Sequence, residues 1–305
     1  MMGRLLAFLM LAMFTAGAAR AQAMRDMVAD FDAFAARTAG MAEGARVAAF
    51  KRTLGPILPG IYDPTSSAGD RAVARALAQW PVKRGAILDA RDRARAAYRT
   101  GLVRFGRAFP GFRPTMPVYL IHSLGQMDGG TREIRGRAVL MFGADVIADI
   151  HAGEAIAPLV DHELFHTYHQ RFFADCPQLW CPLWAEGLAT YVTVSMNPNA
   201  TDSELLLDYP APIRAATDAR MRQALCHARA NLDTTDETLL SSFTDGSHKG
   251  GPYPARFGYY LGYRIAEHMG RDLTLDQLAR LKPAEVRDRI ARAIDSYGRC
   301  GNATD

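Results

Sequence analysis

The chain lacks the features that direct proteins to membranes, nucleic acids or repeat architectures. After residue 23 no apolar run approaches about 20 residues, the length that a helix needs to cross a bilayer, so no membrane-spanning domain is expected. Low-complexity tracts and internal repeats are absent. The 36 lysines and arginines nearly balance the 32 aspartates and glutamates, which gives no electrostatic basis for nucleic acid or an anionic membrane as the main partner.

Cysteine is scarce, with four residues in the whole chain, Cys176, Cys181, Cys226 and Cys300. They form no C-x-x-C pair, which argues against a structural zinc site. An even number of cysteines in an exported protein favours two disulfides, and three pairings are open. We favour Cys176 with Cys181, which would pin a loop, and Cys226 with Cys300, which would tie the C-terminal tail to the body.

The N-terminus reads as a targeting segment. Arg4 precedes a continuous apolar run over residues 5–19, and Ala21-Gln22-Ala23 is a typical cleavage site, so residues 1–23 are predicted to be a signal peptide. Its removal takes away two arginines and no acid, leaving a net charge of +2 on 282 residues. The product is expected to be exported, periplasmic or secreted, without stable insertion in a membrane.

Beyond residue 23 the pattern predicts an α+β protein that is predominantly α. Residues 24–115 read as an N-terminal helical region, with a long helix over 72–109. Short β-rich runs at 118–121 and 138–142 are separated by a segment with a Gly129-Gly130 turn signal. Further helices are expected over 213–230, over 257–269 and, as two shorter ones, over 273–296, with a loop at 241–254. Residues 116–305 are thus predicted to form a catalytic region with a helical C-terminal part.

The most informative stretch is His162-Glu163-Leu164-Phe165-His166, an H-E-x-x-H sequence within a predicted helix over residues 157–172. Residues four apart lie on one helical face, so His162 and His166 can direct their imidazoles at one metal ion. Glu163 lies beside that ion, where it can accept a proton from the attacking water.

A catalytic zinc needs a third protein ligand, and Glu186 in a second apolar-periodic segment is the candidate. His169 is the alternative, seven residues after His162. Its distance from His162 along the helix would be about 10 Å, whereas zinc–nitrogen bonds are only about 2.1 Å, so this geometry disfavours His169. The remaining histidines other than His248 read as surface or core residues.

Together, H-E-L-F-H and the W-A-E-G-L-A-T-Y segment, with 19 residues between His166 and Glu186, resemble the gluzincin branch of the zinc metallopeptidases. The resemblance covers residues 157–196. It implies His162, His166 and Glu186 as zinc ligands, Glu163 as general base, and a small sheet above the H-E-x-x-H helix whose edge strand, ending at residues 142–145, pairs with an extended peptide. Thermolysin-like members have Asp four residues after the third ligand, where this chain has Thr190.

Aminopeptidase-like gluzincins also carry a downstream Y-x-x-G element whose tyrosine hydroxyl stabilises the oxyanion. Tyr259-Tyr260-Leu261-Gly262 resembles it, and Tyr259 is preferred over Tyr260. His248 is a further candidate for that role. The alternative is that these tyrosines and glycines form a helix-packing face.

The motifs favour an exported zinc metallohydrolase, most specifically a peptidase, with Zn²⁺ as cofactor and a peptide or protein as substrate. Two alternatives stay open: a zinc-stabilised binding module without turnover, and an amide or ester hydrolase acting on a non-peptide envelope component. An intact Glu163 weighs against the binding module, because a structural zinc site needs no base.

Overall fold

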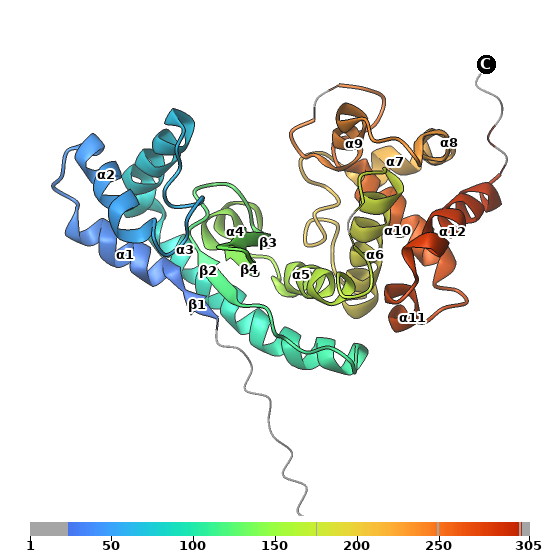
Figure 1. The fold of residues 1–305 in the computed structure, drawn as a ribbon, viewed down its shortest axis with the longest axis horizontal. Helices are drawn as coiled ribbons and strands as arrows, with labels where there is room; N and C mark the ends of the chain where they lie inside the picture. Colours follow the sequence, from blue (N-terminus) through green and yellow to red (C-terminus); the bar gives the residue numbers. More distant parts are fainter. Residues whose placement is uncertain (1–23, 175, 249, 299, 301–305) are drawn as a thin grey trace, which may run out of the picture.

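Helices make up most of the chain, and one four-stranded sheet lies between the N-terminal and the C-terminal helices (Figure 1). The computed structural model describes residues 24–174, 176–248, 250–298 and 300, so the expected signal peptide lies outside the described residues. The predicted α+β, predominantly α class is confirmed.

The strands are β1 (Arg25–Asp26), β2 (Val118–Ile121), β3 (Gly129–Ile134) and β4 (Arg137–Gly143). The helices are α1 (Met27–Arg37), α2 (Glu43–Leu54), α3 (Ser67–Ala108), α4 (Ala144–Ile150), α5 (Ala157–His169), α6 (Trp180–Met196), α7 (Ile213–Asp218), α8 (Met221–Asn231), α9 (Glu237–Thr244), α10 (Phe257–Met269), α11 (Leu275–Ala279) and α12 (Pro283–Ser296).

The sheet has the strand order β1-β2-β4-β3, with β3 antiparallel to β4 and the other pairs parallel. Arg135 and Gly136 join β3 to β4 with positive φ values of 53° and 71°, which suit the right-handed twist of a tight hairpin. The hairpin leaves β3 at the edge of the sheet, next to α5.

The predicted edge strand is therefore wrong. We expected the edge strand to end at residues 142–145 and read Gly129-Gly130 as a turn, but β4 lies inside the sheet and Ala144 begins α4. Both glycines pair with β4 and belong to β3. A helix side chain occupies the space beside Gly129, where a Cβ would lie 2.9 Å from Glu163 Cγ. Glycine thus marks a close approach within a strand.

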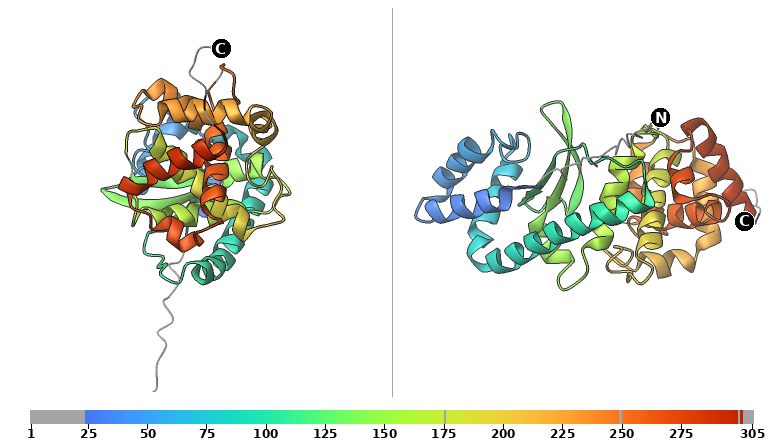
Figure 2. Two further views of the ribbon diagram at one scale, coloured as in Figure 1. Left: turned by 90° about the vertical axis from the view of Figure 1, so that its right-hand side faces the viewer. Right: turned by 90° about the horizontal axis from the view of Figure 1, so that it is seen from below.

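The 42-residue helix α3 links the N-terminal region to the rest of the molecule. The Ser66 side chain caps it by accepting a hydrogen bond from Gly69 N at 3.1 Å. Figure 2 shows α3 running alongside α4 and α5, which it contacts. Because β1 also pairs with β2, the N-terminal helices share one hydrophobic core with the sheet and α5. The short strand β1 was not predicted.

Among the C-terminal helices, α6 and α10 pack most closely. A Cβ on Gly187 would lie 2.3 Å from Gly262 Cα, and one on Gly262 would lie 2.2 Å from Leu183 O, so neither position tolerates a side chain. The predicted helix over 257–269 and the pair within 273–296 are confirmed as α10, α11 and α12. The single helix predicted over 213–230 is two, α7 and α8, and α9 occupies the start of the predicted loop.

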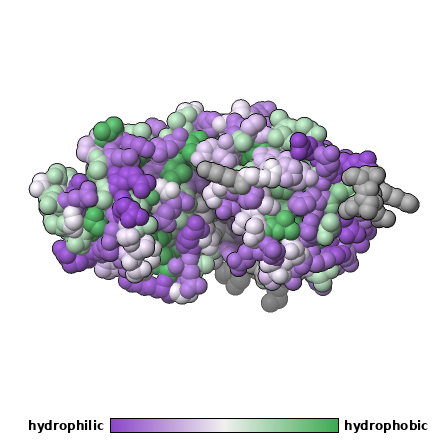
Figure 3. Space-filling model, turned by 90° about the horizontal axis from the view of Figure 1, so that it is seen from above, coloured by the Kyte–Doolittle hydropathy of each residue, from purple (hydrophilic) through white to green (hydrophobic). Residues whose placement is uncertain are grey.

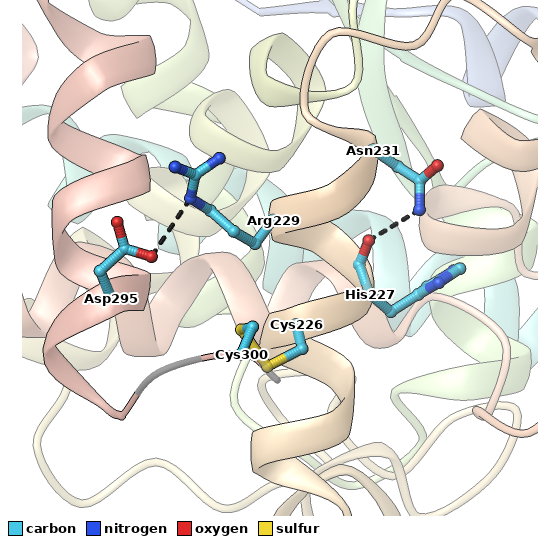
Figure 4. The surroundings of a disulfide bond; sticks show 6 residues. All are labelled: Cys226, His227, Arg229, Asn231, Asp295 and Cys300. Carbon is cyan, nitrogen blue, oxygen red and sulfur yellow. Dashed lines mark hydrogen bonds and ion pairs between the residues drawn. A yellow bond between two sulfur atoms is a disulfide. The ribbon is translucent and has the colours of Figure 1, made fainter. Parts of the chain in front are cut away.

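Both predicted disulfides are present, Cys176–Cys181 and Cys226–Cys300. The second joins α8 to the segment after α12, close to an ion pair between Arg229 Nε and Asp295 Oδ1 at 3.2 Å (Figure 4). Disulfides persist in oxidising compartments. No helix of the described residues is long and apolar enough to span a bilayer. On the face drawn in Figure 3, hydrophobic residues are scattered among hydrophilic ones.

Candidate metal centre

Three side chains from α5 and α6 converge on one point: His162, His166 and Glu186. His162 Nε2 lies 3.0 Å from His166 Nε2, and both nitrogens lie 3.3 Å from Glu186 Oε2. These atoms form a group that could hold a metal ion. The helix period places the two histidines on one face, and the crossing of α5 with α6 brings in the carboxylate from 20 positions away.

The dimensions of this triangle fit a metal ion. Metal–ligand bonds of about 2.1 Å at tetrahedral angles separate the ligand atoms by about 3.4 Å. The observed separations of 3.0–3.3 Å are within a few tenths of that value. Burial acts to raise the pKa of the Glu186 carboxyl, but the adjoining His166 and His162 outweigh it and hold the pKa well below its usual range. The carboxylate is thus ionised, as a ligand must be.

His169 lies outside the group. Its ring is stacked between Phe165 and Phe173, with centroid distances of 5.1 and 4.9 Å, and its Nε2 has no hydrogen-bond partner among the described residues. Burial lowers the pKa of His169 to about 3, so the imidazole is neutral.

Glu163 follows the first histidine of the group and is buried beside it. Burial raises the pKa of its carboxyl to about 7, and repulsion from Asp128 and Glu186 acts in the same direction. Its side chain packs against Gly129 of β3. The carboxyl therefore exchanges protons near neutral pH, the range in which a general base works well.

Tyr259 on α10 faces the group, and Tyr260 does not. The Tyr259 ring lies nearly parallel to the His162 ring, at 6.3 Å and 19°, and lines the same cleft. Burial raises the Tyr259 pKa, so the hydroxyl remains a neutral donor. Tyr260 instead donates to Asp218 Oδ1 at 2.9 Å, and His248 is not among the cleft-lining residues. The choice of Tyr259 over Tyr260 agrees with this geometry, and its catalytic role stays a prediction.

The residue next to the first histidine, Asp161, anchors α5. This fully buried carboxylate accepts hydrogen bonds from Arg104 Nη2 of α3 at 2.6 Å and from Asn197 Nδ2, at the end of α6, at 2.8 Å. It therefore fixes the helix that carries the histidines to α3 and to the helix that carries Glu186. Thr190 donates to Glu186 O at 2.8 Å, along its own helix.

The group lies in a cleft of about 410 Å³ between α5, α6, the edge strand β3 and the N-terminus of α10. Sequence reasoning missed several of its walls. His151 Nε2 lies 3.2 Å from Asp128 Oδ2 at the start of β3, and two arginines, Arg132 and Arg256, line the cleft. If residues 129–134 had been recognised as a strand, Asp128 and Arg132 could have been predicted beside the site. No local sequence pattern marks His151 or Arg256.

Comparisons with protein-family models, curated proteins and solved structures found no match for this chain.

Proposed function

We propose that the protein is an exported zinc metallopeptidase of the gluzincin type. The observation that carries this proposal is the convergence of His162, His166 and Glu186 next to a buried Glu163. Two imidazoles and one carboxylate are a typical catalytic zinc set, which leaves a coordination position for a reactant. A purely structural site has no use for a fourth, basic side chain beside the ligands.

Glu163 and Tyr259 have different roles in the proposed hydrolysis. When bound, zinc supplies Lewis-acid activation of a water molecule and of the substrate carbonyl. Glu163 accepts a proton from the attacking water on its carboxylate and then donates it to the leaving amine nitrogen. The Tyr259 hydroxyl donates a hydrogen bond to the carbonyl oxygen as negative charge develops there.

The edge strand supports a peptide as the substrate. β3 pairs on one side with β4, and residues 129–132 line the cleft. An extended peptide can add to such an edge through backbone hydrogen bonds, which would place its carbonyl groups beside the group of ligands. A non-peptide amide or ester would not use these backbone donors and acceptors.

Replacing Glu163 with Gln tests the function. Gln has nearly the same shape but cannot accept the proton, so hydrolysis of unstructured protein should fall at least about 100-fold. Zinc content, measured by elemental analysis, should stay the same. Wild-type hydrolysis by a zinc-loaded Glu163→Gln protein would reject this site, and absence of any wild-type turnover would favour the binding-module alternative.

A further inference from the structure

The backbone at Arg256 is held in an unusual conformation at the edge of the cleft. Arg256 is the N-cap residue of α10 and has φ 62° and ψ 14°, the left-handed region that favours glycine. Such conformations persist where the surrounding structure enforces them, and they cluster at functional sites. The conformation therefore marks Arg256 as a candidate functional residue at the edge of the cleft.

The side chain packs on Tyr259, next to the candidate metal centre. The Arg256 guanidinium lies over the Tyr259 ring, with its carbon 4.3 Å from the ring centroid, and that ring is nearly parallel to the His162 ring at a centroid distance of 6.3 Å. The aliphatic part of the Arg256 side chain packs against Gly246, where a Cβ would lie 3.3 Å from Arg256 Cδ. The positive charge is thus fixed close to the group of ligands.

Among the described residues the recorded contacts of this guanidinium are with Tyr259, over the ring and through a side-chain hydrogen bond, and no carboxylate forms an ion pair with it. The nearby carboxylates serve other groups. Asp128 pairs with His151, and Glu204 accepts hydrogen bonds from Ala155 N and Thr201 N. A positioned guanidinium with five N–H donors and no carboxylate partner among the described residues is well suited to bind a planar carboxylate with two hydrogen bonds.

We propose that Arg256 binds a carboxylate of the substrate, so that the enzyme prefers peptides with a free carboxylate close to the cleaved bond. This inference rests on the proposed function and names its substrate class. The carboxylate is either the C-terminal one or that of an acidic side chain. A phosphate dianion fits less well, because Glu163, Glu186, Asp128 and Glu204 line the same cleft and would repel its second charge.

The test measures binding to the zinc-loaded Glu163→Gln protein by calorimetry, so that it needs no turnover. The probes are N-acetylated trialanine as the free acid and as the amide. We expect the acid to bind at least 10-fold more tightly than the amide. The same preference should appear in the metal-free protein, which separates binding to Arg256 from direct ligation of the metal.

Arg256→Gly in the Glu163→Gln background should abolish the preference, because it should weaken binding of the free-acid peptide and leave binding of the amide unchanged. Glycine suits the left-handed backbone, so this variant should fold, as checked by its unfolding temperature. Arg256→Lys should keep part of the preference. Arg271→Met, which removes an exposed arginine outside the cleft, is the matched control and should leave both affinities unchanged.

A second pair of probes distinguishes the two carboxylate sources: N-acetyl-Ala-Glu-Ala amide and its Gln counterpart. A preference for the Glu peptide that is lost in Arg256→Gly assigns the site to an acidic side chain, whereas a preference confined to the free acid assigns it to the C-terminus. Equal binding of acid and amide in both pairs overturns the proposal. So does an equal loss for acid and amide in Arg256→Gly, which would make Arg256 a positioning residue for Tyr259.

Discussion

The side chain of Glu163 packs against the backbone of Gly129, so closely that a Cβ at position 129 would lie 2.9 Å from Glu163 Cγ and 3.2 Å from its Oε1. The edge strand β3 therefore forms one wall of the space in which the candidate base lies. Because the cleft-facing edge of β3 pairs with no other described strand, in the proposed reaction one strand would both position the base and receive the peptide. Strand and helix must be held together for the site to work.

Gly129→Ala should lower activity without removing the metal. The added methyl group has no free space, so it will displace the Glu163 carboxyl, and displacements of about 1 Å at a reacting group can cost about 100-fold in rate. We expect a 10- to 100-fold fall in kcat with unchanged zinc content. Steady-state kinetics with elemental analysis provides the check.

The matched control for this substitution is Gly85→Ala on α3, where nothing lies within 4 Å of the added Cβ. Alanine is favoured over glycine in a helix by about 1 kcal/mol, so this variant should be slightly more stable and fully active. Full activity in Gly129→Ala would show that Glu163 is not confined by β3.

Glu186→Ala should weaken zinc binding, and His169→Phe should not. Glu186 contributes one of the three converging atoms, whereas His169 lies outside the group. Wild-type protein is expected to hold about one zinc per chain. Competition with a chelator gives the affinity of each variant. If His169→Phe loses the metal and Glu186→Ala keeps it, the third ligand has been assigned wrongly, and iron in place of zinc would reject the cofactor.

Acid should destabilise the protein through His169. Its pKa is about 3 in the folded chain and about 6.5 when unfolded, so the unfolded state binds the proton first. The stability from keeping His169 neutral is complete above about pH 6.5 and is lost as the pH falls, by about 2 kcal/mol at pH 5.

His169→Phe should remove this loss, because Phe retains the stacking with Phe165 and Phe173 and carries no titrating group. Urea unfolding of both metal-free proteins at pH 8 and pH 5 measures the difference. Between these pH values the variant should gain about 2 kcal/mol relative to wild type. Parallel acid profiles for the two proteins would show that His169 is solvated in the folded state.

The two disulfides should differ in their contribution to stability. Cys226–Cys300 spans 74 positions and Cys176–Cys181 spans 5. In the chain-entropy model, the long loop contributes about 4 kcal/mol and the short one about 2 kcal/mol. Paired Cys→Ala variants, compared by urea unfolding, should reproduce this order. A larger loss for the short loop would mean that Cys176–Cys181 acts by fixing the connection between α5 and α6 in the folded state.

Local chemistry in the sequence determined much of this protein. The spacing of four between His162 and His166 requires a common helical face wherever the helix lies, and the apolar period of residues 257–269 marks α10 to its ends. The number of cysteines and the export signal favoured two disulfides, and both pairings are confirmed.

The tertiary structure decided what depends on contacts between distant segments. Gly129 reads as a turn by its own propensity but belongs to a strand because it pairs with β4, and glycine is required there because Glu163, 34 positions later, occupies the space beside it. Arg256 carries no motif. Its guanidinium lies over Tyr259, three residues later at the start of the same helix, but only the packing of α10 against α6 brings this pair toward His162. Propensity acts over a few residues, whereas the residues that line this cleft come from six separate parts of the chain, so their assembly follows from the packing of the core.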